Sequence, residues 1–233
     1  MGVVVILLVV VAFGVIAYFS WLSAKKRREA FAAFAAQNGW RLAAADDSWV
    51  GRWSGDPFRT GDHRRARNVL TGERDGRQIV AFDYSYQTHS TDSHGRRQTQ
   101  THRFGVCAVS LAGALPTLQV TGEGIFSRIG HALGFDDIEF ESEDFNRKFR
   151  VTGDDRKFAY DVVHPRMMEY LLARGDVAWR LEGDTIYCWD GGQHKPAEVM
   201  TRLEFLDGIG DRIPDFVWRD RGILPPATST QEA

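Results

Sequence analysis

The sequence predicts an α+β fold in which one N-terminal transmembrane helix is followed by a mostly antiparallel sheet with C-terminal helices packed on it. Three observations predict this fold. An uncharged apolar run fills residues 3–22, alternating apolar and polar residues dominate the middle of the chain, and helical spacing of apolar residues returns near the C-terminus. We expect a transmembrane anchor over 1–24, one α+β domain over 25–220 and a disordered tail over 221–233.

The composition is that of a folded protein. Of 233 residues, 43% are hydrophobic and 26% are charged, which leaves ample apolar material for a core. The formal net charge is −2. Nucleic-acid-binding proteins usually carry a basic face or stripe, so we expect no nucleic acid partner.

The apolar run meets the length needed to cross a bilayer, roughly 20 residues. A cleavable signal peptide is the alternative, but only Met1 and Gly2 precede the run, and a positive leader is missing. Positive residues beside a spanning helix stay inside, so we expect a single-pass protein of the cell membrane whose C-terminal domain faces the cytoplasm. The predicted membrane-interface residues, which face anionic lipids, are Trp21, Lys25, Lys26, Arg27 and Arg28.

The first elements after the anchor are a short helix and a set of strands. Residues 25–38 are rich in helix formers, with Phe31 and Phe34 on one face, and Gly39 is the expected stop. Residues 40–58 are expected to form a loop. The strands that follow are predicted from alternation, as a hairpin around Asp75-Gly76 and a continuing antiparallel meander, at 67–73, 77–88, 103–111 and 117–121.

The second half of the domain is expected to mix helices with short strands. An acidic strand is predicted at 136–144, and a hairpin around Gly183-Asp184 is predicted to join 177–181 to 186–188. The spacing of apolar residues predicts helices over 123–133, 154–163, 165–175 and 196–206. Pro165 and Pro196 suit the first turns of the last two helices.

Two long stretches are specific in order and spacing: Pro57–Thr88 (PFRTGDHRRARNVLTGERDGRQIVAFDYSYQT) and Phe140–Leu172 (FESEDFNRKFRVTGDDRKFAYDVVHPRMMEYLL). Together with the apolar run in front of them, they resemble an uncharacterised, domain-of-unknown-function family of single-pass membrane proteins of actinobacteria. The likeness covers most of the chain from Gly39 to Trp189. It implies the membrane topology and brings no catalytic residues, because that family has no assigned activity.

A histidine-rich loop is the main candidate for chemistry. His89, Asp92 and His94 are grouped after the 77–88 strand, and His102 begins the next strand. Neutral imidazole is a common ligand for Zn²⁺ and Fe²⁺, so these four residues are the candidate metal ligands. A solvated hairpin tip explains the same residues without a metal and is the favoured interpretation, because no recognised ligand spacing is present.

The remaining clusters favour structural interpretations. The basic cluster of Arg59, His63, Arg64, Arg65 and Arg67 is interpreted as a solvated loop paired with acidic neighbours, with lipid contact as the alternative. The two cysteines, Cys107 and Cys188, lie in apolar strand-like runs and are expected to be buried free thiols. The aromatic sets Trp49, Trp53 and Phe58, and Tyr84 and Tyr86, are expected to fill the core.

These observations favour a membrane-tethered cytosolic binding or scaffold module over an enzyme. No phosphate loop, nucleophile elbow or zinc-protease motif is present in the sequence. The expected partners are the lipid bilayer and another envelope protein. The alternative is a metal-dependent enzyme or metal sensor that uses the loop at 89–102 with Zn²⁺ or Fe²⁺, and otherwise no cofactor is predicted.

Overall fold

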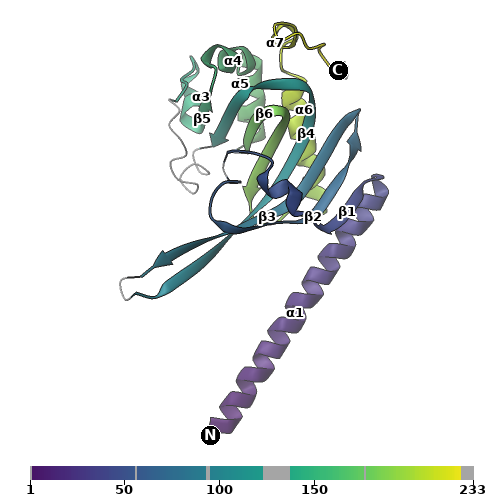
Figure 1. Ribbon diagram of the computed structural model, residues 1–233, viewed down its shortest axis with the longest axis vertical. Helices are drawn as coiled ribbons and strands as arrows, with labels where there is room; N and C mark the ends of the chain where they lie inside the picture. The colour runs from purple at the N-terminus through teal and green to yellow at the C-terminus, as the bar shows by residue number, and fades with distance from the viewer. Residues whose placement is uncertain (1, 56, 93–94, 123–136, 176, 227–233) are drawn as a thin grey trace.

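A long helix, a strongly twisted sheet and a layer of helices make up the structure, a computed structural model that describes residues 2–55, 57–92, 95–122, 137–175 and 177–226 (Figure 1). Within the first helix it describes side chains at positions 10 and 11 and from 13 onward. The helices are α1 (Gly2–Gln37), η1 (Asp47–Gly51), α3 (Glu143–Lys148), α4 (Arg156–Val162), α5 (Pro165–Arg174), α6 (Pro196–Gly210) and α7 (Asp215–Arg219). The strands are β1 (Arg41–Ala45), β2 (Asp62–Arg74), β3 (Arg77–Thr91), β4 (Arg97–Gly122), β5 (Phe149–Gly153) and β6 (Ala178–Gly191).

The described strands form one antiparallel sheet in which β4 is the central strand. β1, β2, β3 and β4 follow one another in space as they do in sequence. β4 pairs with β3 through its first half and with β5 through its last residues, while β6 pairs with both parts of β4. The far ends of β3 and β4 extend beyond the other strands as a two-stranded ribbon, residues 88–91 and 97–100, which projects from the domain (Figure 1).

The sheet has a core on each face because its strands alternate buried residues to both sides. The larger core lies under the C-terminal part of α1 and the helices α4, α5 and α6, and contains Phe31, Leu118 and Leu203. The smaller core is aromatic and lies under η1 and residues 52–55 and 57–61. There the Trp53 ring stacks on Tyr187 with centroids 4.6 Å apart.

The aromatic residues and cysteines lie where the sequence predicted them. Trp53, Phe58, Tyr84 and Tyr86 are buried in the smaller core, and Trp49 packs against it. Cys107 and Cys188 are buried free thiols that face each other across β4 and β6. The interpretation of these residues as core is confirmed.

The transmembrane part of the predicted fold class is contradicted. α1 is one continuous helix, Gly2–Gln37, yet among the described residues no helix is both apolar enough and long enough to cross a bilayer. The predicted anchor over 1–24 is therefore wrong on this finding, and the single-pass topology inferred from it is unsupported.

Several predicted elements are confirmed. The helix predicted at 25–38 forms the end of α1, with Phe31 buried and Gly39 in the left-handed region at φ 67°. The hairpin around Asp75-Gly76 joins β2 to β3, and Pro165 and Pro196 begin α5 and α6. The predicted strands at 103–111 and 117–121 are parts of the single strand β4.

Other predicted elements are wrong for local physical reasons. The acidic segment forms no strand over 137–142: the Phe140 backbone bonds to the Asn146 side chain, and the Ser142 side chain accepts a hydrogen bond from the Phe145 amide and caps α3. Gly183-Asp184 is no hairpin turn, since β6 continues through it and pairs with β4 on both sides. The loop expected at 40–58 contains β1 and η1. The helix predicted at 123–133 lies outside the described residues.

The structure describes the first residues of the predicted tail, 221–226. The Ile223 amide donates to the Trp218 carbonyl oxygen at 3.0 Å, and its side chain packs against the larger core, so 221–223 continue the folded domain. Residues 227–233 of the predicted tail lie outside the described part.

Gly72 in β2 gives a test of this packing. A Cβ atom there would lie 2.2 Å from Cδ1 of Trp40, so Gly72→Ala must displace a buried ring. We expect this variant to lower the free energy of unfolding by about 1–3 kcal/mol in urea denaturation. The control is Gly51→Ala, where a Cβ would meet nothing within 4 Å. Equal stability of the two variants would contradict the packing.

Candidate functional site

An ion pair between α1 and the middle of the sheet fixes the position of the long helix. Arg27 Nη1 donates to Asp83 Oδ2 at 2.7 Å, and Nη2 donates to Oδ1 at 2.8 Å. The Asp83 side chain is 6% exposed and that of Arg27 is 24% exposed. Two parallel hydrogen bonds between a guanidinium and a carboxylate define both the distance and the orientation of the groups. The geometry therefore holds α1 in one orientation on the sheet.

Two further residues complete this network. Asn68 Nδ2 donates to Asp83 Oδ2 at 2.7 Å, and the His194 amide donates to Oδ1 at 3.1 Å. Arg27 also donates to the His194 carbonyl oxygen, at 2.6 Å from Nη2. The buried carboxylate thus has donors from α1, β2 and the β6–α6 loop, as a buried charge requires. Asn68 reaches it from a left-handed backbone conformation, φ 49°, at an irregularity in β2.

His194 lies between this network and the two cysteines. Its side chain is 2% exposed, and its Nε2 lies 3.6 Å from Cys107 Sγ. A Cβ atom at Gly105 would come within 2.6 Å of the imidazole, so only glycine leaves room for the ring. Burial lowers the pKa of His194 to about 4, and the nearby Arg202 adds to this effect. Burial also raises the pKa of the Cys107 thiol, so the imidazole and this thiol are both neutral.

Sequence reasoning did not find Asp83, Asn68 and His194 as partners of Arg27. Arg27 was predicted to face lipid with the other interface residues, but its guanidinium is bound inside the domain. The other basic residues of that set, Lys25, Lys26 and Arg28, are exposed, and their role remains a prediction. The available signal was Asp83 itself, a carboxylate within a run of buried strand residues, which needs a cation.

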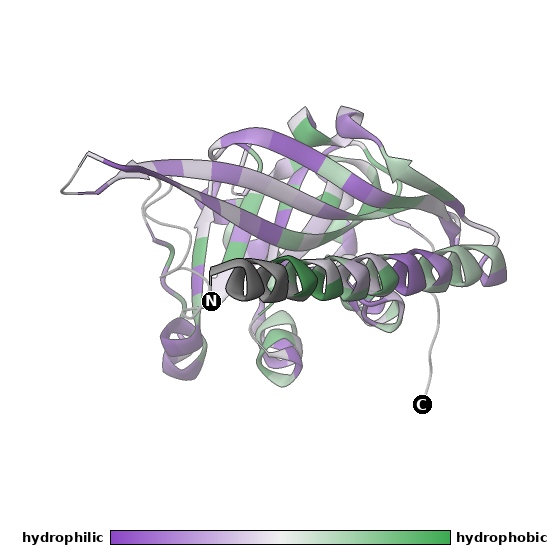
Figure 2. Cartoon of the chain, turned by 90° about the horizontal axis from the view of Figure 1, so that it is seen from below, coloured by the Kyte–Doolittle hydropathy of each residue, from purple (hydrophilic) through white to green (hydrophobic). Residues whose placement is uncertain are grey.

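The part of α1 before this ion pair carries an exposed apolar surface. It extends away from the sheet (Figure 1). Figure 2 shows hydrophobic residues along this part of the helix, followed by a hydrophilic stretch of the same helix. The large apolar side chains there are between 49% and 69% exposed: Val10, Val11, Phe13, Val15, Ile16, Tyr18, Phe19 and Trp21. Monomeric proteins rarely expose a contiguous apolar surface of this kind unless it binds something.

Of the four predicted metal ligands, the three that the structure describes, His89, Asp92 and His102, do not form a cluster. His102 Nε2 pairs with Thr88 Oγ1 at 2.9 Å, and its ring stacks on Tyr86. Asp92 accepts a hydrogen bond from the Arg96 amide in the hairpin tip. His94 lies outside the described residues. Of the predicted residues, His89 lies close to two other potential metal ligands, which the prediction did not include.

Those residues are Asp62 and His63, at the start of β2. One ligand atom from each of Asp62, His63 and His89 lies within 4.8 Å of the others, and no other such group of three is found among the described residues. The hydrogen bond with His63 lowers the pKa of Asp62. The available signal was the Asp62-His63 pair inside the basic cluster, but the strand register that brings His89 to it cannot be read from spacing alone.

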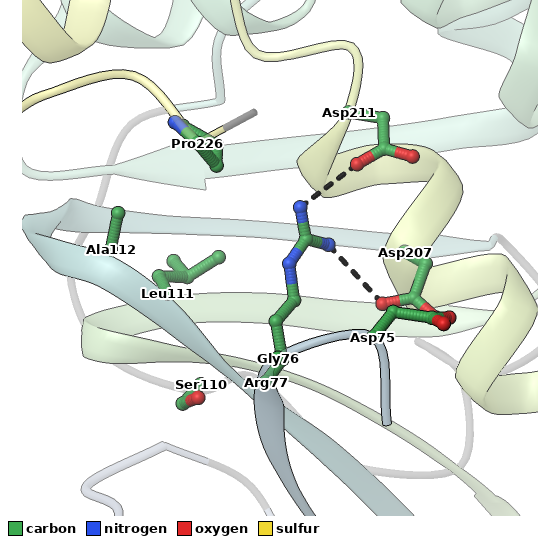
Figure 3. Close-up of a pocket in the computed structure, with 9 residues that line it drawn as sticks. All are labelled: Asp75, Gly76, Arg77, Ser110, Leu111, Ala112, Asp207, Asp211 and Pro226. Atoms are coloured by element: carbon green, nitrogen blue, oxygen red, sulfur yellow. Dashed lines mark hydrogen bonds and ion pairs between the residues drawn. The ribbon is translucent and has the colours of Figure 1, made fainter. Parts of the chain in front are cut away.

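A pocket of about 300 Å³ lies where the β2–β3 turn meets β4 and α6 (Figure 3). Arg77 points into it and is bound to Asp207 at 3.2 Å and to Asp211 at 2.8 Å. Arg74 adds a second contact to Asp207 at 2.7 Å. Burial raises the pKa of Asp207. These ion pairs tie the β2–β3 hairpin to α6.

Comparison with known proteins identifies a shared fold. No protein-family model matches the sequence, and no curated protein matches it. The structure is similar to the crystal structure of the mycobacterial trehalose monomycolate transport factor A, TtfA, with a TM-score of 0.58 and 13% identity. The match covers 81% of this chain and 95% of that one. At this identity the likeness shows the fold alone, and the resemblance to the actinobacterial family stays a prediction.

Removing Arg27 should destabilise the domain. Arg27→Ala leaves Asp83 buried with an uncompensated charge, so we expect the free energy of unfolding to fall by about 3 kcal/mol in urea denaturation. Arg28→Ala is the matched control, because Arg28 is exposed and the change should stay within about 0.5 kcal/mol. If both variants are equally stable, the ion pair does not hold α1 in place.

His194 should make stability depend on pH. Its pKa is about 4 in the folded protein, whereas the ordinary pKa of a histidine is 6.5, so the unfolded chain binds the proton more strongly between these values. The contribution of neutral His194 to the free energy of unfolding is therefore fully present above pH 6.5 and is lost as the pH falls toward 4. Relative to His194→Gln, we expect the wild-type protein to lose up to about 3 kcal/mol more of unfolding free energy between pH 7 and 4. Parallel pH profiles in urea denaturation would contradict this expectation.

Proposed function

We propose that this chain is a binding module that associates with a lipid membrane through the exposed apolar part of α1. The observation that carries the proposal is the group of large apolar side chains between Val10 and Trp21, each about half exposed or more. Transferring such side chains out of water gains about 1.5–3 kcal/mol for each one that is fully buried. The whole group would therefore gain on the order of 10 kcal/mol in an apolar environment.

The distribution of these side chains favours lipid over a single protein groove. Successive positions in an α-helix are rotated by about 100°, so exposed apolar residues at Phe13, Val15, Ile16 and Tyr18 point in different directions around the helix. A lipid surface can take up apolar side chains that point in several directions without needing a matching groove.

The basic residues that follow the apolar part of α1 also favour a lipid membrane as the partner. Lys25, Lys26 and Arg28 are exposed directly after the apolar part, and Lys25 Nζ lies 5.5 Å from the Trp21 ring centroid. Each lysine or arginine near an anionic lipid surface contributes about 1 kcal/mol of attraction. Tyr18 and Trp21 are side chains that prefer the boundary between lipid and water.

The attachment of α1 to the sheet links the position of the helix to the position of the domain. Because Arg27 is bound to Asp83 and Phe31 is buried in the larger core, movement of the helix is coupled to the domain. Association with a membrane would restrict the domain to two dimensions and raise its effective concentration toward other membrane components. TtfA, which has the same fold, is named a transport factor, and this supports an accessory binding role beside another envelope protein.

Vesicle flotation of the full chain tests the proposal. Protein purified in detergent is exchanged into vesicles of phosphatidylcholine with phosphatidylglycerol, and the fraction that floats is measured. We expect the wild-type chain to float and Ile16→Glu with Phe19→Glu to lower the partition coefficient by at least about 100-fold, since each carboxylate costs roughly 2–3 kcal/mol in lipid.

The matched control is Leu224→Glu, which changes a side chain that is 87% exposed outside α1 and should float like wild type. Unchanged flotation of the Ile16 and Phe19 double variant would refute the proposal. So would equal loss of flotation in the Leu224 variant, because the effect would then reflect added charge in general.

A further inference from the structure

Strand register brings Asp62 and His89 to the same face of the sheet. Asp62 is opposite Gln87 in the β2–β3 pair, and His89 lies two residues further along β3. Residues two apart in a strand share a face, and such diagonal neighbours are within reach of long side chains. His89 Nε2 accordingly lies 3.2 Å from both carboxylate oxygens of Asp62.

A backbone irregularity brings His63 to the same place. Neighbouring residues in a regular strand point to opposite faces, but the register of β2 shifts between Asp62 and Arg65, and His63 has a left-handed φ of 49°. Its Nδ1 therefore lies 3.0 Å from Asp62 Oδ1. Non-glycine residues adopt this conformation at a cost in free energy, and the tight turn at Gly61, φ 65°, precedes it.

We propose that Asp62, His63 and His89 form a binding site for a divalent transition-metal ion such as Zn²⁺. Two imidazoles and one carboxylate are a donor set that zinc and ferrous iron both accept. Ligand atoms in a tetrahedral zinc site with bonds of about 2.0–2.1 Å lie roughly 3.3 Å apart. Asp62 already meets this spacing with both histidines, at 3.0 and 3.2 Å.

Closing the site needs only side-chain movement. The three ligand atoms lie within 4.8 Å of one another, so His63 and His89 must approach by at most about 1.5 Å to reach the tetrahedral spacing. His63 is exposed, with 66% of its side chain accessible, so rotation of its ring meets little resistance. One coordination position would remain open to water or to a ligand from a partner, as in zinc sites with three protein ligands.

Thr99 supplies the outer contact that such a site needs. Its Oγ1 lies 2.9 Å from His89 Nδ1, from the position directly opposite His89 in β4. With a metal ion bound, Nδ1–H would donate to this hydroxyl and leave Nε2 unprotonated for the ion, whereas without an ion the contact between Nε2 and the Asp62 carboxylate requires a proton on Nε2. Histidine ligands commonly have their second nitrogen held in this way, which fixes the tautomer and the ring orientation.

The position of the site indicates what a bound ion would do. Asp62 and His63 belong to the start of β2, whereas His89 and Thr99 belong to the ribbon that projects from the domain (Figure 1). A metal ion would join the base of the ribbon to the adjacent strand. Binding should therefore stabilise the ribbon against opening, and the open coordination position would face solvent beside it.

Calorimetric titration of the full chain in detergent with Zn²⁺ at pH 7.5 tests this inference. We expect one ion per chain, and a loss of affinity of at least 100-fold in His89→Ala and in His63→Ala. Thr99→Val, which keeps shape but removes the hydroxyl, should weaken binding by about tenfold. Lowering the pH to 5.5 should weaken wild-type binding, because protonated imidazoles cannot coordinate a metal.

His102→Ala is the matched control, since His102 lies on the same ribbon but pairs with Thr88, outside the cluster. Its affinity should stay within twofold of wild type, and circular dichroism should show that every variant is folded. Stoichiometric binding that survives in His63→Ala and His89→Ala would overturn the proposal. An equal loss in His102→Ala, or no binding by the wild-type chain, would overturn it as well.

Discussion

The contact between Arg27 and Asp83 determines how the two parts of the molecule are arranged. A carboxylate in the middle of a sheet is costly unless its charge and its lone pairs are satisfied. Here the donors come from α1, from an irregular position in β2 and from the β6–α6 loop, which are distant in sequence. The long helix, the sheet and the C-terminal helices therefore depend on one another at this point, and none can shift without exposing a buried charge.

The same contact marks the boundary between two different segments of α1. After Arg27 the helix buries Phe31 and Ala35 in the larger core, and before it the apolar side chains are exposed. A continuous helix transmits position from one segment to the other because its backbone hydrogen bonds resist bending. The exposed segment is thus presented at a fixed angle to the domain.

The ribbon and its base illustrate how sheet irregularities create sites. Regular strands place neighbouring side chains on opposite faces, so Asp62 and His63 would be separated in an undisturbed β2. The register shift brings them together beside His89. Asn68, at the second irregularity of the same strand, is directed at Asp83 in a comparable way. These two polar clusters therefore depend on places where the pairing of β2 departs from the regular pattern.

The sequence by itself determined the α+β class, the helix after the apolar run, the Asp75-Gly76 hairpin and the burial of the aromatic residues and cysteines, because these depend on local periodicity and turn chemistry. The tertiary structure decided what depends on pairing between distant residues. Strand β6 continues through Gly183 because β4 supplies hydrogen bonds on both sides, and Arg27 is bound to Asp83 rather than exposed. His89 meets Asp62 and His63, instead of Asp92 and His102, because register and a bulge set its neighbours. Neither the strand register nor the position of a bulge can be deduced from the spacing of residues along the chain.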